Sequence, residues 1–226
     1  MSEPLIALQD IHFAYAPDRP LFNGLSFDLA AGDRVALTGA NGAGKTTLLE
    51  MMIGLKQPIA GSIHVFGRSR QREADFIEVR QRVGLVFEDP DDQLFCATVE
   101  EDIAFGPFNL GWSRDRVQQA VRDTLQLVGL ANFGQRITYH LSRGEKRLVA
   151  IASVLAMQPE VLLLDEPTLG LDEDRVEALL QLLNRRDGAL VVVSHDADFR
   201  DRVTSRTVTL LDGGSRTVFG SGFSAG

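Results

Sequence analysis

The segment "DRVALTGANGAGKTT", residues 33–47, constrains the fold of this chain more than any other segment. Its first part is apolar enough for a buried strand, and the part after Gly39 is rich in glycine and fits the pattern G-x-x-x-x-G-K-[ST]. A helix is expected to follow over residues 45–55. A strand that runs through a glycine loop into a helix is the opening unit of an α/β fold with a parallel sheet.

The same loop indicates phosphate binding. Glycines let several backbone N–H groups converge on phosphate oxygens, and the helix N-terminus adds its positive end. Lys45 is placed to reach the outer phosphates of a nucleotide, and the Thr46 hydroxyl to ligate Mg²⁺. The alternative, a glycine turn that contains a lysine by chance, is disfavoured by the flanking strand and helix. The predicted nucleotide-binding residues of this loop are Gly39, Asn41, Gly42, Ala43, Gly44, Lys45, Thr46 and Thr47.

A second apolar strand, "VLLLDEP" at residues 161–167, ends in two acids. After a phosphate loop, Asp165 is expected to hold Mg²⁺, and Glu166 to take a proton from the water that attacks the γ-phosphate. Without that loop, two acids would indicate only the end of a strand. "GALVVVSHD" at residues 188–196 is another uninterrupted apolar strand. Such strands, separated by helices, predict a parallel sheet covered on both faces.

Two further patterns complete the expected architecture. "LIALQDIHFAY" and "LFNGLSFDLA" predict N-terminal strands joined by the turn "APDRP". Residues 98–157 have helical periodicity and interrupt the alternation of strands and helices, so they predict a helical subdomain within a single domain over residues 1–226. The only linker-like segment is a Gly/Ser-rich tail after Leu211.

A third motif, "LSRGEKR" at residues 141–147, contains the capping box of a helix start, with Ser142 and Glu145 three residues apart. A phosphate loop, an LSxGE helix start, VLLLDEP and a histidine after "VVVS" follow one another in this chain. Together they resemble the ATP-binding cassette (ABC) ATPases over essentially the whole sequence. The resemblance implies a P-loop NTPase cassette with a mainly parallel core sheet, an N-terminal antiparallel β part and a helical subdomain, which uses ATP and Mg²⁺.

The resemblance also implies roles for single residues. Tyr15 would stack on adenine, although a tyrosine at a strand end can equally be a core residue. Asp172 would couple two nucleotide sites, and His195 would contact the γ-phosphate as part of the catalytic machinery, where a lone histidine could otherwise be solvated. The implied contacts of the LSxGE segment are Ser142, Arg143, Gly144 and Glu145. Of these, the serine and the glycine would contact the γ-phosphate bound by a second cassette.

Two positions depart from the family pattern. Glu88 stands where the family usually has a glutamine that contacts Mg²⁺ and the attacking water, so it is expected to act as a metal ligand. Arg143 stands where a glycine is commonest. Impaired hydrolysis, in a chain that works as a nucleotide-gated dimerisation module, is therefore an alternative to an efficient ATPase.

The segment "DPDDQLF", followed by "TVEEDIAFGPFNLG", resembles the ATPases of energy-coupling-factor importers, closest to those for cobalt or nickel ions; a vitamin importer is the alternative. The resemblance implies a homodimer or a second ABC ATPase, a transmembrane coupling subunit and a substrate-binding membrane subunit. The chain would then lie peripherally on the cytoplasmic face of the inner membrane. Asp89, Asp91 and Asp92 are expected to form a coupling surface toward basic groups of the transmembrane subunit, unless they are only a solvated turn.

Composition excludes other classes of function. A net charge of −8 and a pI near 5.0 argue against a nucleic-acid partner. A single cysteine, Cys96, allows no internal disulfide, and the N-terminal residues lack the pattern of a signal peptide.

DNA-repair ATPases with related heads separate their two nucleotide motifs by a long coiled coil, and translation-factor relatives carry two cassettes. Neither feature occurs here.

Overall fold

The computed structural model describes residues 3–16, 18–211 and 217–221, and it contains two sheets. The first is antiparallel, with the strand order β2-β1-β4-β5. Its strands are β1 (Ile6–Ala16), β2 (Arg19–Leu29), β4 (Ala60–Val65) and β5 (Arg68–Arg70). The expected N-terminal pair therefore forms, and its pairing extends to Ala16 opposite Arg19.

The second sheet has the order β10-β9-β3-β8-β7-β6, and every pair is parallel except β9 with β10. Its strands are β3 (Arg34–Gly39), β6 (Val83–Val86), β7 (Val161–Asp165), β8 (Ala189–Val193), β9 (Arg206–Leu210) and β10 (Thr217–Ser221). The prediction of a linker-like tail after Leu211 is wrong for residues 217–221, which pair with the edge strand β9. The rest of that tail, 212–216 and 222–226, lies outside the described residues.

Seven α-helices lie in the described part of the chain: α1 (Lys45–Met52), α2 (Ile77–Arg82), α3 (Val99–Asn109), α4 (Arg114–Leu127), α5 (Arg143–Leu155), α6 (Glu173–Arg185) and α7 (Ala197–Val203). The helix expected over residues 45–55 ends earlier, at Met52. Ser142 is the N-cap of α5, as its capping box predicts. No helix in the described ranges has the length and apolar character needed to cross a bilayer.

The parallel sheet separates two apolar clusters, because side chains alternate between the faces of a strand. On β7, Val161 and Leu163 join the cluster that contains α1 and the antiparallel sheet. Leu162 and Leu164 join the cluster that contains α3, α4, α5 and α6. The uninterrupted apolar strands of the sequence are thus explained by burial on both faces, as predicted.

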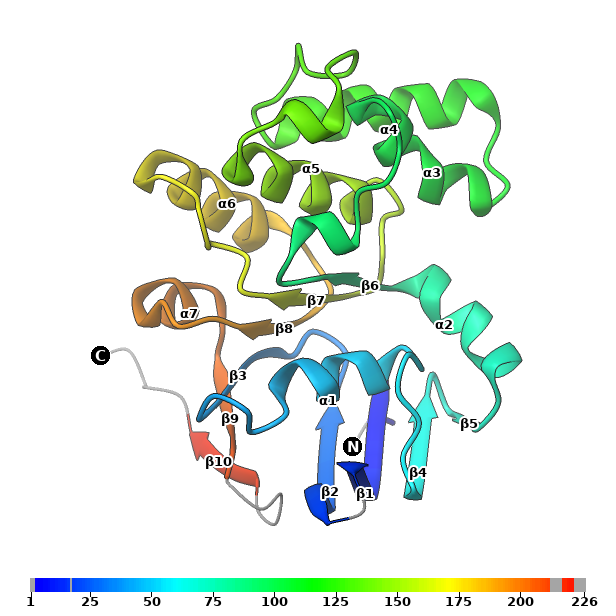
Figure 1. The fold of residues 1–226 in the computed structure, drawn as a ribbon, viewed down its shortest axis with the longest axis vertical. Coiled ribbons are helices and arrows are strands. Elements are labelled where there is room, and N and C mark those ends of the chain that lie inside the picture. Colours follow the sequence, from blue (N-terminus) through cyan, green and yellow to red (C-terminus); the bar gives the residue numbers. More distant parts are fainter. Residues whose placement is uncertain (1–2, 17, 212–216, 222–226) are drawn as a thin grey trace.

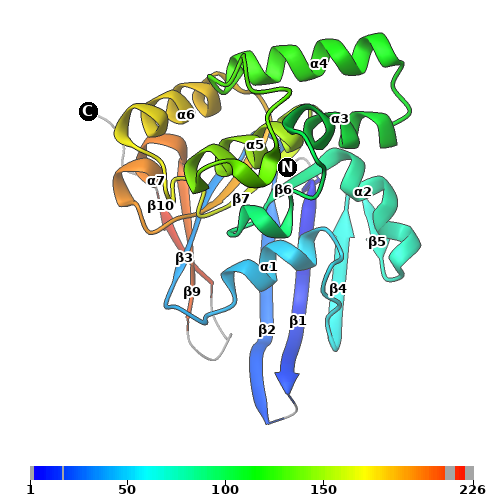
Figure 2. The ribbon, with the colours of Figure 1, turned by 45° about the horizontal axis from the view of Figure 1, so that its top comes forward.

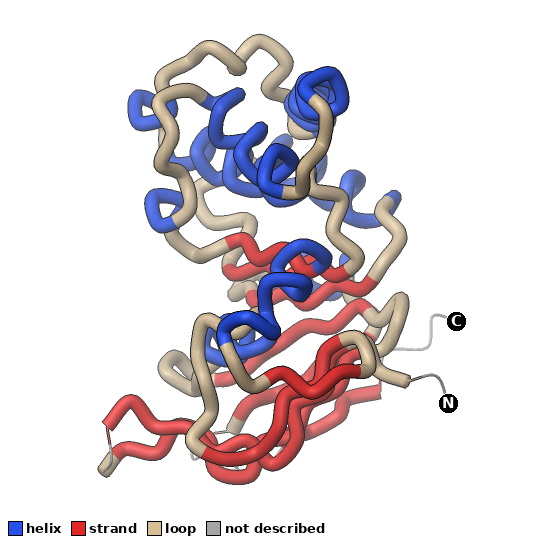
Figure 3. The backbone as a smooth tube through the Cα atoms, turned by 90° about the vertical axis from the view of Figure 1, so that its right-hand side faces the viewer, coloured by secondary structure: helices blue, strands red, loops and turns tan. Residues whose placement is uncertain are grey.

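Figures 1 and 2 show α3, α4 and α5 grouped on one side of the parallel sheet, with α1 on its other side, against the antiparallel strands. The side view in Figure 3 has strands in its lower half and most of the helices above them. The helical group shares its apolar cluster with the sheet, so it is packed on the core rather than separate from it. The carboxyl ends of β3, β7 and β8 lie side by side, which is where open parallel sheets bind ligands.

Candidate nucleotide site

The loop between β3 and α1 has the backbone of a phosphate cradle. Gly42 and Gly44 have φ of 81° and 95°, values that side chains disfavour. At Gly44 a Cβ would also lie 2.6 Å from the Phe22 ring, and at Gly39 it would lie 2.5 Å from the carbonyl oxygen of Leu210. Close packing therefore requires glycine at positions 39 and 44, whereas a Cβ on Gly42 would meet no atom within 4 Å and only its conformation favours glycine.

Two side chains at the start of α1 occupy the cradle. Lys45 Nζ donates to the carbonyl oxygens of Gly39 and Ala40 at 2.9 and 3.0 Å. The Thr46 hydroxyl donates to Asp165 Oδ2 at 2.6 Å, across from the end of β7. The phosphate loop and the second acidic motif therefore meet, although they are 119 residues apart in sequence.

Asp165 is buried, with 2% of its surface exposed. Burial raises the pKa of this carboxyl to about 6, and the negative charges of Glu88 and Glu166 add to the rise. The hydrogen bond from Thr46 and the charge of Lys45 act in the opposite direction. A doubly charged cation at this position would relieve the repulsion among the three carboxylates, which is compatible with the predicted role of Asp165 toward Mg²⁺.

Glu166 has a φ of 46°, in a region that residues other than glycine rarely adopt. Its N–H donates to the carbonyl oxygen of Val193 at 2.8 Å, and its carboxylate accepts the backbone N–H of His195 at 3.1 Å. The His195 ring lies 3.6 Å from the same carboxylate. Strain of this kind persists where neighbouring contacts enforce it, and here it brings the predicted base and the predicted histidine together.

Tyr15 is 63% exposed, so it is not a core residue. Its hydroxyl hydrogen-bonds to Thr47 Oγ1 at 2.8 Å, and its ring makes an edge contact with Phe13 at 5.0 Å between centroids. The ring is thereby held at the rim of the phosphate loop, where Lys56 Nζ lies over it at 5.6 Å from the centroid. This supports the adenine-stacking role over the alternative of a buried strand-end tyrosine.

One cavity of about 780 Å³ collects these groups. The predicted residues that line it are Tyr15, Asn41, Gly42, Ala43, Gly44, Lys45, Thr46, Thr47, Glu88, Asp165, Glu166 and His195. Gly39 does not line it, and packs against β9 instead. Sequence reasoning missed Ala16, Arg19, Pro20, Leu21 and Val193. The sequence contained a signal for Arg19, because the turn "APDRP" follows Tyr15 directly. A hairpin turn lies next to the end of its strand, so residues of this turn lie near Tyr15.

The LSxGE segment does not line this cavity. Ser142 accepts from the Glu145 N–H at 3.3 Å, and the Glu145 carboxylate accepts from the Ser142 N–H at 2.8 Å. A Cβ on Gly144 would lie 2.5 Å from the carbonyl oxygen of Gly170, so the segment packs against the loop before α6. Asp172 caps α6 by accepting from the Arg175 N–H at 2.9 Å. Within one chain the structure does not bring Ser142, Arg143, Gly144, Glu145 or Asp172 to the cavity.

The residues present fit Mg²⁺ and a nucleoside triphosphate. Hydroxyl and carboxylate oxygens are the ligands that Mg²⁺ prefers, and Thr46 with Asp165 supplies one of each, with Glu88 on the same cavity wall. Mg²⁺ at this point would neutralise charge on the phosphates. The chain's own groups would cradle the phosphates (the loop and Lys45), stack the base (Tyr15) and accept a proton from water (Glu166).

Comparisons with known proteins agree with this geometry. The family model "ABC transporter" matches residues 22–169. A putative ABC transporter ATP-binding protein of Brucella suis is 47% identical over 93% of this chain and 87% of its own length. The energy-coupling factor transporter ATP-binding protein EcfA of Methanothermobacter thermautotrophicus is 41% identical over 92% of this chain and 68% of its own length.

Solved structures give the same result. The structure of cbiO1 from Clostridium perfringens, part of the ABC transporter complex cbiONQ, superimposes with a TM-score of 0.82 at 30% identity, covering 96% of this chain and 88% of that one. The ATP-binding cassette MJ0796, in a dimeric structure bound to ADP and Pi, has a TM-score of 0.86 at 23% identity. The match covers 96% of this chain and 100% of the MJ0796 chain, and it supports the fold. This chain therefore belongs to the ABC transporter family, as an ATPase of the energy-coupling-factor type that works with ATP and Mg²⁺.

Proposed function

We propose that this chain powers an importer of cobalt or nickel ions by hydrolysing ATP beneath membrane-embedded partners. The observation that carries this is the segment at residues 89–111, which resembles that of cobalt and nickel importers. A cobalt or nickel cargo would cross through the membrane subunits, so the chain itself supplies only the energy. Import of a vitamin by the same kind of complex is the alternative.

The separation of the two nucleotide-contacting segments supports pairing of two cassettes. The cavity holds the phosphate loop, whereas Ser142, the N-cap of α5, and Gly144, in its first turn, lie outside the cavity lining. In the proposed complex, Ser142 and Gly144 complete the site of a second cassette, identical or not, and the second cassette completes this one. Each ATP is then held between two chains.

The proposed docking surface for the transmembrane subunit combines acids and exposed rings. Of the three predicted acids, Asp89 accepts from the Asp91 N–H at 3.0 Å, and Asp91 forms an ion pair with Lys146 at 2.6 Å. Three residues beyond Asp92 in the chain, Phe95 forms an edge contact with Phe105, with 4.8 Å between centroids, and the two rings are 67% and 47% exposed. Glu100 and Glu101 line the same surface pocket as Phe105, and exposed rings with acids beside them fit a helix with apolar and basic residues. Such a partner would hold the chain at the cytoplasmic face of the inner membrane.

The docking proposal is tested by neutralising Asp89, Asp91 and Asp92 together to asparagine. Basal ATPase activity of the isolated chain should stay intact, and co-purification with the membrane subunits should weaken. The matched control neutralises Asp187, Asp198 and Asp201, which are exposed acids near β8 and α7. Loss of ATPase activity in the isolated docking variant, or equal loss of co-purification in both variants, would contradict the proposal.

The cargo is tested with the native complex. The membrane subunits that co-purify with the chain are identified and reconstituted with it in proteoliposomes. ATP-dependent uptake of Co²⁺ or Ni²⁺ is the expected result, and it should vanish with Glu166→Gln. Uptake of a vitamin without uptake of either metal would establish the alternative.

A further inference from the structure

The loop at residues 87–93 leads from β6 toward α3 and presents Glu88 to the nucleotide cavity. Arg147, on α5, lies beneath this loop and is completely buried. One terminal nitrogen of its guanidinium donates to the carbonyl oxygen of Phe87 at 2.6 Å, and the other donates to that of Glu88. A buried guanidinium bonded to two successive carbonyls fixes the backbone that carries Glu88.

Gln93 ties the far end of the same loop to the same helix. Its amide nitrogen donates to the carbonyl oxygen of Ala150 at 2.8 Å and lies 2.9 Å from Ser153 Oγ. Its amide oxygen accepts the Phe87 N–H at 3.3 Å, so the loop is also closed on itself. Removing one side chain at position 93 would therefore break three polar contacts without changing any charge.

The contacts on the helix side follow one stripe of α5. Lys146, Ala150 and Ser153 are separated by four and three residues, the spacing of neighbours on one helix face, and Arg147 lies beside them. Lys146 adds an ion pair with Asp91, which contributes little because the carboxylate is 65% exposed, so neutralising Asp91 leaves the loop attached to α5. The same helix begins at its N-cap Ser142. One rigid element thus connects Glu88 at the cavity with the serine that faces a second cassette.

We infer that Arg147 and Gln93 are positioning residues that join the Glu88 loop to α5, so that the placement of Glu88 at one nucleotide and of Ser142 at the other is set together. This inference rests on the proposed pairing of two cassettes. It assigns the coupling between the two ATP sites to hydrogen bonds inside one chain. Neither side chain lines the cavity.

The test measures ATP-dependent dimerisation of the full chain in a Glu166→Gln background, for Arg147→Met, Arg147→Lys and Gln93→Leu. Dimerisation should weaken by about 5–150-fold for the methionine and leucine variants, the usual range for coupling between two sites. The lysine variant keeps the charge but cannot reach both carbonyls, so it should fall in between. ATP binding to the dilute monomer should change little, because the phosphate loop is intact.

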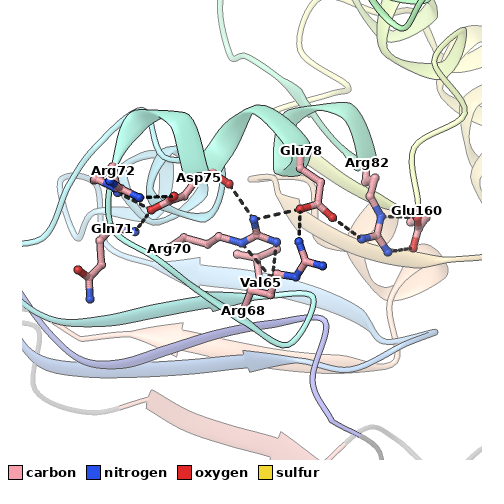
Figure 4. A network of polar contacts seen from close by, with 9 residues as sticks. All are labelled: Val65, Arg68, Arg70, Gln71, Arg72, Asp75, Glu78, Arg82 and Glu160. Atoms are coloured by element: carbon pink, nitrogen blue, oxygen red, sulfur yellow. Dashed lines mark hydrogen bonds and ion pairs between the residues drawn. The ribbon is translucent and has the colours of Figure 1, made fainter.

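A matched control is Arg70→Met, because Arg70 is also buried and also donates to carbonyl oxygens, those of Val65 and Asp75. Figure 4 shows it in a network with Glu78 that joins β5 to α2. None of these residues lines the nucleotide cavity. The control should lower the melting temperature and leave ATP-dependent dimerisation of the folded protein unchanged.

The outcomes separate the possible failures. If dimerisation survives in both Gln93→Leu and Arg147→Lys, or if the Arg70 control loses it equally, the coupling role is overturned and the contacts are only structural. If the Glu166→Gln parent does not dimerise with ATP, the pairing of cassettes is wrong and the inference fails with it. Should Arg147→Met not fold, the other two variants decide. The nature of the cargo does not affect any of these results.

Discussion

The nucleotide cavity and the LSxGE segment differ in how their polar groups are satisfied. In the cavity, groups from distant strands contact one another, as Thr46 does with Asp165 and Glu166 with His195. At the start of α5, Ser142 and Glu145 satisfy each other's backbone within one helical turn. The cavity is thus built by contacts between distant segments, whereas the capping hydrogen bonds at the start of α5 are made within one helical turn.

The two regions also differ in how many unfavourable charges and backbone conformations they contain. The cavity holds a buried Asp165 with a pKa of about 6 and a Glu166 with a φ of 46°, both unfavourable in the absence of ligand. The helix start has a capping box and no residue with a positive φ between Ser142 and Leu155. Unfavourable groups are therefore concentrated at the cavity, where a cation would offset the charge of Asp165. Substitutions in the two regions should accordingly have opposite effects on stability and on pairing.

The largest effect is expected at Glu166. Glu166→Gln removes the proton acceptor and keeps the phosphate contacts, so ATP binding should persist while hydrolysis falls by about 10²–10⁴-fold. The variant should accumulate as an ATP-bound dimer. Phosphate release and light scattering with ATP measure the two results. Hydrolysis at the wild-type rate would show that Glu166 is not the base.

Asp165→Asn should reveal the electrostatic cost of the cavity. Because the folded-state pKa is raised from 3.8 to about 6, the folded state holds this proton more tightly than the unfolded state. The contribution of this carboxyl to the free energy of unfolding is greatest below pH 3.8, falls as the pH rises to about 6, and stays low above that pH. Without Mg²⁺, the asparagine variant should be more stable than wild type at pH 8 by up to about 3 kcal/mol.

The measurement is urea unfolding of both proteins between pH 4 and 8, with EDTA. Asparagine keeps an oxygen that can accept from Thr46, so the hydrogen bond is not lost. The stability difference should shrink toward pH 4, and ATP hydrolysis by the variant should collapse because the metal loses its charged ligand. A difference that does not depend on pH would mean that Asp165 carries no such cost.

Glu88→Gln should have a smaller effect. The amide keeps an oxygen at the same place and removes one of the negative charges that raise the pKa of Asp165. We expect activity similar to wild type with a several-fold changed Mg²⁺ requirement, since the carboxylate attracts the cation more strongly than the amide does. ATPase activity is measured across a Mg²⁺ titration. An unchanged titration would remove Glu88 from the metal site, and a large rise in rate would mark it as inhibitory.

The sequence was most informative where local chemistry decides the structure. The glycine pattern before Lys45 and the capping box at Ser142 are satisfied within a few residues, so both helix starts were predictable. The apolar runs of β7 and β8 report burial on two faces. Asp165 and Glu166 line the cavity because the end of a parallel strand defines their position, and their roles stay predictions.

Other features depend on contacts that sequence patterns do not report. The strand β10 forms by backbone pairing with β9, and its Gly/Ser-rich surroundings gave no alternating pattern. Arg147 is completely buried although arginine is usually exposed, because two carbonyls of a distant loop accept its hydrogen bonds. The signal for Arg19 was present in the turn after Tyr15, but only the folded hairpin shows that it lines the cavity.

Arg143→Gly should have the smallest effect, and it sharpens the distinction between the two regions. Arg143 is exposed at the first position of α5, and its Cγ would lie 3.7 Å from a Cβ placed on Gly170, so the side chain runs beside that loop. A glycine there costs less than about 1 kcal/mol of helix stability. The serine hydroxyl and the Gly144 N–H, which are expected to contact the second cassette's ATP, are unchanged.

The measurement is nucleotide-dependent dimerisation in the Glu166→Gln background, with Ser142→Ala and Gly144→Asp beside it. Ser142→Ala removes the expected phosphate contact and the N-cap, which is worth about 1 kcal/mol. Gly144→Asp adds a negative charge and a Cβ that would lie 2.5 Å from the Gly170 carbonyl oxygen. Both should cripple pairing, while Arg143→Gly leaves it almost unchanged. If Arg143→Gly instead turns an inert protein into one that dimerises, this arginine blocks the LSxGE segment, and the gated dimerisation alternative becomes the better account of the chain.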